Sequence, residues 1–156
     1  MHVLQRLQQP GIEVAPDCTI QQAAVIMNDA GVGTVAVVDG DLLLGIATDR
    51  DIVRRAVARG LPLDSRVDGV MSSPVHTVDA ADDVDRAVSM FGTVGVRRLA
   101  VVDEGRFIGI LSLDDLLVDL AGQLAIIAAP LASEIAIPHR DSSVPATVPP
   151  ESPSTG

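Results

Sequence analysis

The chain repeats itself at an offset of 64 residues, and this duplication constrains the fold more than any other feature. The segment Gly-Ile-Ala-Thr-Asp-Arg-Asp-Ile at 45–52 recurs as Gly-Ile-Leu-Ser-Leu-Asp-Asp-Leu at 109–116. Between 14–52 and 78–116 no gap is needed, and 11 of 39 aligned positions are identical. Apolar and turn positions keep one register throughout. The chain therefore contains two tandem copies of one supersecondary unit.

Each copy is predicted to contain a strand, a helix, two strands and a second helix. Apolar residues at helical spacing indicate the first helix, and Gly31 and Gly95 stand where a C-cap glycine belongs. A nearly continuous apolar run then predicts a buried strand. The predicted elements are strands 12–14, 34–38 and 42–47 with helices at 19–30 and from Thr48, then strands 76–78, 99–102 and 107–111 with helices at 83–94 and from Ser112. The fold class is α+β, a pseudo-symmetric pair of β-α-β-β-α repeats.

Composition shifts set the predicted boundaries. They are a first repeat at 3–60, a linker at 61–73, a second repeat at 74–128, a C-terminal extension at 129–137 and a disordered tail at 138–156. The tail holds five of the ten prolines, a composition that does not repay the entropy of ordering. The apolar stretch 116–137 is interrupted by polar residues and Pro130, which predicts a core or interface helix followed by a turn.

Charge and residue usage exclude several functions. The net charge is −10, which disfavours nucleic acid and anionic lipid, and only two Phe and no Trp or Tyr are present for base stacking. All 11 basic residues are Arg, so lysine-dependent phosphate and Schiff-base chemistry is excluded. One Cys and three scattered His form no zinc spacing. We expect a cytoplasmic protein that binds no metal, no nucleic acid and no membrane.

The duplicated unit, with Gly-apolar-x-Thr/Ser-x-x-Asp at its last strand-to-helix turn, resembles the cystathionine-β-synthase (CBS) domain family over about residues 3–128. Two such domains in tandem are similar to a Bateman module. The resemblance implies that the two sheets pack together and leave two related clefts. It implies adenosine-containing ligands there, such as AMP, ADP, ATP or S-adenosylmethionine, and regulation without catalytic residues.

The motif itself has two interpretations. Its hydroxyl and carboxylate residues are Thr48 with Asp51 and Ser112 with Asp115, three apart at a helix start, which is the spacing of a capping box. The same carboxylate could instead accept hydrogen bonds from the two hydroxyls of a ribose. The duplication favours ribose contact in at least one copy.

The resemblance assigns six residues to each cleft. One set is Ile12, Val32, Gly33, Ile110, Ser112 and Asp115, and the other is Ile46, Thr48, Asp51, His76, Val96 and Arg97. His76 replaces an aliphatic residue and argues against tight purine binding beside it. Arg97 is assigned to ligand phosphates and is expected to serve the Ser112/Asp115 cleft, the alternative being a surface arginine. Arg97 and Arg98 are adjacent on a strand, so both cannot point inward.

Two functions remain open. The first is a regulatory adenine-nucleotide sensor, a homodimer that signals to an unidentified target protein. The alternative is a ligand-free CBS-pair dimer acting as an interaction scaffold or stress-response protein. A hydrolase is disfavoured because no Ser-His pair, metal cluster or Lys is present. The homodimer is expected because apolar residues continue past the second motif, at Leu113, Leu117, Ala121, Leu124 and Ile127.

Overall fold

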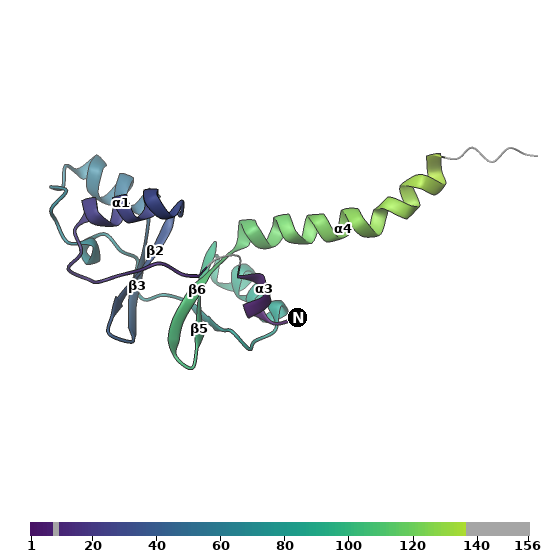
Figure 1. Ribbon diagram of the computed structural model, residues 1–156, viewed down its shortest axis with the longest axis horizontal. Coiled ribbons are helices and arrows are strands. Elements are labelled where there is room, and N and C mark those ends of the chain that lie inside the picture. The colour runs from purple at the N-terminus through teal and green to yellow at the C-terminus, as the bar shows by residue number, and fades with distance from the viewer. Residues whose placement is uncertain (8–9, 137–156) are drawn as a thin grey trace, which may run out of the picture. The chain divides into compact units, whose positions relative to one another are not determined.

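The computed structural model describes residues 1–7 and 10–136 (Figure 1). The predicted disordered tail at 138–156 lies outside the described residues. The chain divides into one compact unit, Met1–Leu120, and a second unit that starts at Ala121. Both three-stranded sheets and the helices up to residue 94 lie within the first unit, whereas the last helix, α4 (Leu113–Ala136), begins in the first unit and continues into the second.

The predicted order of elements is confirmed in both repeats. The first repeat contains β1 (Glu13–Val14), α1 (Ile20–Ala30), β2 (Thr34–Asp39), β3 (Leu42–Thr48) and the short helix α2 (Asp49–Asp51), which continues as η2 (Ile52–Ala56) and η3 (Val57–Arg59). The second contains β4 (Thr77–Asp79), α3 (Val84–Val94), β5 (Arg98–Asp103), β6 (Arg106–Ser112) and α4 (Leu113–Ala136). Helices α1 and α3 both end at glycines in the left-handed region, Gly31 at φ 66° and Gly95 at φ 73°.

Each repeat forms a three-stranded sheet, ordered β1-β2-β3 and β4-β5-β6. In both, the first pair of strands is parallel and the second antiparallel. One face of each sheet packs against helices, and the other faces meet at Ala36, Val38, Ala100 and Phe107. The sheets approach closely here: a Cβ on Gly11 would lie 2.3 Å from the Phe107 ring. The α+β fold with packed sheets is therefore as predicted.

The segment that precedes each repeat packs on the other repeat. The short helix η1 (Val3–Arg6) packs on the second repeat, where the Val3 N–H donates to the Asp82 carbonyl over 2.9 Å. Helix η4 (Val67–Gly69) packs on the first repeat in the same way, and the Val67 N–H donates to the Cys18 carbonyl over 2.8 Å. Both valines are fully buried. The predicted linker thus contributes to the core of the first repeat.

The predicted turn within 116–137 was wrong, because α4 continues to Ala136 with Pro130 inside it. Ala128 and Ala129 precede Pro130 and Leu131 and Ala132 follow it; all have high helix propensity, so the helix bends near its C-terminal end (Figure 1) instead of ending at the proline. Most of its apolar side chains are exposed, including Leu124, Ile126 and Ile127. By length and composition alone, Leu113–Ser133 is also sufficient to cross a membrane, which is weak evidence for a span.

Candidate functional site

A cavity of about 460 Å³ lies between the two repeats, at the second copy of the motif. Of the seven residues expected in this cleft, all but Arg97 line it: Ile12, Val32, Gly33, Ile110, Ser112 and Asp115. Its other lining residues are Arg6, Pro10, Gly11, Gly31, Thr34, Arg98 and Asp114. The volume is in the range of small-molecule sites. The residues of the other predicted set do not line this cavity.

Both repeats supply its walls. Ile12 comes just before β1, and its carbonyl accepts from the Ala36 N–H over 2.8 Å, which fixes it beside β2. Val32 and Gly33 follow the C-cap of α1. The opposite wall comes from β6 and the first turn of α4, where Ser112 ends the strand and Asp115 lies in the helix. The site therefore depends on how the repeats pack.

The carboxylate and hydroxyl of this motif are available to a ligand. In the part of the chain that the structure describes, the Ser112 hydroxyl and the Asp115 carboxylate make no hydrogen bond. Asp115 is exposed toward solvent and Ser112 is half-buried. The first helical turn around them also has a positive dipole end that favours anionic groups.

The first copy of the motif is closed on itself. The Thr48 Oγ1 accepts from the Asp51 N–H over 3.0 Å, and the Asp51 Oδ2 accepts from the Thr48 N–H over 3.0 Å, a reciprocal capping box. Thr48 is buried, and the Asp51 side chain is 17% exposed. In this copy the motif therefore caps the helix.

The guanidinium of Arg55 stabilises this closed copy. Its Nη1 donates to the Val70 carbonyl over 3.0 Å and to the Met71 carbonyl over 2.9 Å, and its Nε lies 3.8 Å from the Asp51 Oδ1. The chain's own cation thus lies next to the carboxylate that a ribose would contact. His76, predicted for this cleft, is exposed, and Ile46 and Val96 are half-buried.

Arg97, which precedes β5, and Arg98, its first residue, point to different places. Arg98 pairs with Ser112 in the β5–β6 register, lines the cavity and has no carboxylate partner among the described residues. Arg97, assigned to phosphates by the resemblance, does not line the cavity; it forms an exposed ion pair with Asp114 over 2.5 Å. The alternation of side chains between the two faces of β5 was the sequence signal that could have placed Arg98 in the cavity. Because Leu99 packs toward the helices, Arg98 faces the other sheet.

Comparison with known proteins assigns the family. The CBS domain family model matches residues 8–58 and 67–122. The chain belongs to the CBS domain family. It contains two such domains in tandem, as the sequence predicted.

Similar CBS proteins include one from Bacillus subtilis, the CBS domain-containing protein YhcV, which is 36% identical over 106 residues, 68% of this chain and 76% of YhcV. The CBS domain protein PAE2072 from Pyrobaculum aerophilum, solved in complex with AMP, has a TM-score of 0.67 and 26% identity, over 78% of this chain and 99% of that one. The CBS domain pair of MJ0100, solved with 5′-methylthioadenosine and S-adenosyl-L-methionine, has a TM-score of 0.69 and 25% identity, over 79% and 98%.

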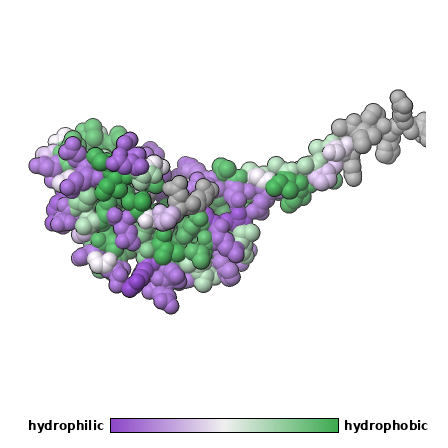
Figure 2. All heavy atoms as spheres, viewed as in Figure 1, coloured by the Kyte–Doolittle hydropathy of each residue, from purple (hydrophilic) through white to green (hydrophobic). Residues whose placement is uncertain are grey.

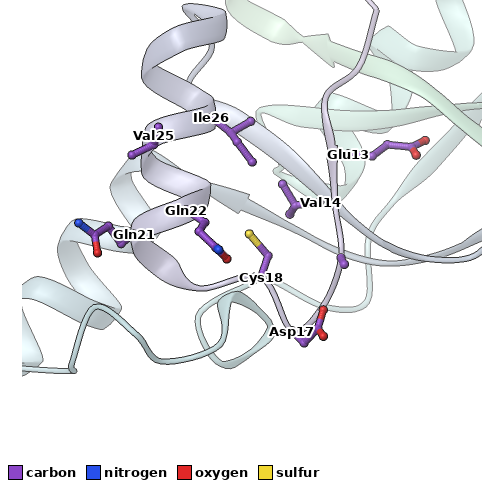
Figure 3. Close-up of a pocket in the computed structure, with 9 residues that line it drawn as sticks. Glu13, Val14, Asp17, Cys18, Gln21, Gln22, Val25 and Ile26 are labelled. Carbon is purple, nitrogen blue, oxygen red and sulfur yellow. The ribbon is translucent and has the colours of Figure 1, made fainter.

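A second hollow in this CBS pair, of about 730 Å³, lies between β1 and the start of α1 (Figure 3). Its lining includes Glu13, Asp17 and two glutamines but no cation, so it does not suit a phosphate. Cys18 also lines it. Burial and the nearby Asp17 raise the pKa of the Cys18 thiol, which therefore stays protonated at neutral pH and is a poor nucleophile.

The cavity is lined by two arginines and two aspartates. Arg6 pairs with Asp119 of α4, and Asp114 pairs with Arg97. Arg98 and Asp115 have no ion-pair partner among the described residues. Among the described residues, no three His, Cys, Asp or Glu side chains gather where a metal ion could bind. With Ile12, Val32 and Ile110 on its wall together with Arg98, the cavity can hold a ligand that has one apolar and one anionic end.

Proposed function

We propose that this CBS pair is a regulatory module that binds one adenosine-containing ligand per chain, in the cavity of Ser112 and Asp115. The observation that carries the proposal is the difference between the two motifs. The Thr48/Asp51 copy uses its hydrogen-bonding groups on itself, whereas the Ser112/Asp115 copy leaves them without partners on a cavity wall.

Each part of such a ligand has a complementary wall. The Asp115 carboxylate accepts from the two ribose hydroxyls, and the Ser112 hydroxyl supports it. The base lies against the apolar side chains of Ile12, Val32 and Ile110. The guanidinium of Arg98 takes the phosphate. The AMP, methylthioadenosine and S-adenosylmethionine in the PAE2072 and MJ0100 structures support this class of ligand.

A regulatory role for the bound ligand is proposed because the lining of the cavity has no catalytic pair. Its lining holds no Ser-His or Cys-His pair and no Lys, so a bound ligand would be held and not converted. Because both repeats supply walls, occupancy stabilises one arrangement of the pair over others. We propose that a cytoplasmic homodimer passes this arrangement to a target protein.

Isothermal titration calorimetry on the full chain tests the proposal with AMP, ATP and S-adenosylmethionine. One of them should bind with a stoichiometry of one per chain and raise the melting temperature. Ribose 5-phosphate is the control, because it retains the sugar and phosphate but has no base to fill the apolar wall. If none of the three stabilises the protein at millimolar concentration, the ligand-free scaffold is the better account.

A further inference from the structure

The exposed face of α4 carries a heptad repeat. Apolar residues recur at alternating spacings of four and three along the helix, at Leu113, Leu117, Leu120, Leu124, Ile127 and Leu131. This is the a/d pattern of a coiled coil, in which the hydrophobic period of 3.5 keeps one stripe facing a partner helix. We call these six residues the α4 seam. At 1.5 Å per residue the seam is about 27 Å long.

Most residues of the seam are exposed. Leu113 is half-buried against the second repeat, but Leu124, Ile127 and Leu131 are 66%, 68% and 58% exposed. Figure 2 shows apolar side chains on the surface of α4. Stripes of this kind mark interaction sites, because single exposed leucines are common but a periodic row of them is not.

The flanking positions indicate which partner fits. The e and g positions beside the seam are Asp114, Leu116, Ala121, Gln123, Ala128 and Pro130. Asp114 is the one charged residue among them, lies in the first turn and already pairs with Arg97, so the exposed part of the seam has uncharged flanks. Charges at e and g select a different partner helix or repel an identical one. Two copies of α4 therefore meet without like-charge repulsion, although the chain as a whole has a net charge of −10. A second copy of the chain also has the same heptad period, because its sequence is identical.

A bilayer fits the helix less well. Asp114, Asp115 and Asp119 occupy its first two turns, and Asp119 pairs with Arg6 of the compact unit. The stretch free of charge is residues 120–133, which rises about 21 Å, whereas a hydrocarbon core is about 30 Å thick. Pro130 bends the helix within this stretch.

We infer that the α4 seam is a coiled-coil interface between two copies of this chain. The inference does not depend on the ligand, because it uses only the pattern and exposure of α4. Sedimentation equilibrium of the ligand-free full chain should give about twice the 16.2 kDa monomer mass at micromolar concentration.

A matched pair of variants tests which face is used. Leu124→Glu places a carboxylate in the seam and should weaken dimerisation by at least about 100-fold, because an unpaired charge in an apolar interface is strongly disfavoured. Ile126→Glu makes a comparable change two residues away, at an outward position that is 75% exposed, and should leave the mass unchanged. Ile126→Glu should melt like the parent. Leu124→Glu should still unfold cooperatively, but its melting temperature should no longer rise with protein concentration, because dimerisation no longer stabilises the folded chain.

Three results would overturn the inference. The first is a monomeric parent chain at micromolar concentration. The second is dimerisation that survives Leu124→Glu or is lost equally in Ile126→Glu. The third is flotation of the parent chain with phosphatidylcholine vesicles that both substitutions abolish, which would assign the helix to a membrane. The AMP titration reports on the cavity separately, so failure of one proposal does not affect the other.

Discussion

Replacing the carboxylate of the second motif should weaken ligand binding, whereas replacing that of the first motif should destabilise the fold. Asp115→Ala removes two charge-assisted hydrogen bonds to the ribose, each worth about 1.5 kcal/mol at the solvent-exposed end of the range. At about 1.4 kcal/mol per factor of ten, the affinity for the adenosine ligand should fall by about 100-fold. Stability should change by less than about 1 kcal/mol, because the chain makes no hydrogen bond to this carboxylate and loses only its favourable position in the first helical turn.

Asp51→Ala should leave the affinity nearly unchanged and destabilise the fold. Its carboxylate caps the Thr48 N–H over 3.0 Å, and losing such a cap costs about 0.5–2 kcal/mol. For a chain of this size that lowers the melting temperature by about 2–4 °C per kcal/mol. Calorimetry and thermal melting on both variants decide the assignment. If Asp51→Ala abolishes binding while Asp115→Ala retains it, the cavity is not the ligand site.

Three further predictions concern phosphate binding, packing and pH. Arg98→Ala should weaken ATP binding more than adenosine binding in calorimetry, whereas Arg97→Ala should change neither; equal effects would contradict the register argument. Gly45→Ala should destabilise the chain by about 1–3 kcal/mol in urea denaturation, because its Cβ would lie 2.6 Å from a methionine sulfur, while Gly92→Ala in open helix should stabilise it. The Asp85 backbone N–H and the N-terminal ammonium hold the pKa of Asp83 below its ordinary value of 3.8. The stabilisation of the fold by the Asp83 carboxylate should therefore be lost as the pH falls below 3.8, and Asp83→Asn should remove this part of the pH dependence of stability.

The architecture was largely readable from the sequence. Repeats, hydrophobic period and C-cap glycines are local properties, and they predicted the order of the elements in both repeats. The six residues that line one cavity were named by the resemblance to the CBS family and not by composition or spacing. The tail at 138–156 and the boundary positions stay predictions.

Tertiary structure decided what distinguishes the two copies. The sequence showed the same hydroxyl and carboxylate spacing twice, but among the described residues only the first copy closes on itself in a capping box, beside an Arg55 guanidinium that reaches the carbonyls of Val70 and Met71. Those carbonyls belong to the segment between the repeats, which only packing brings to the first motif. Similarly, Arg98 faces the cavity because of the face on which Leu99 is buried. Local pattern therefore determines which elements form, whereas contacts between residues distant in sequence determine which hydrogen-bonding groups remain available to a ligand.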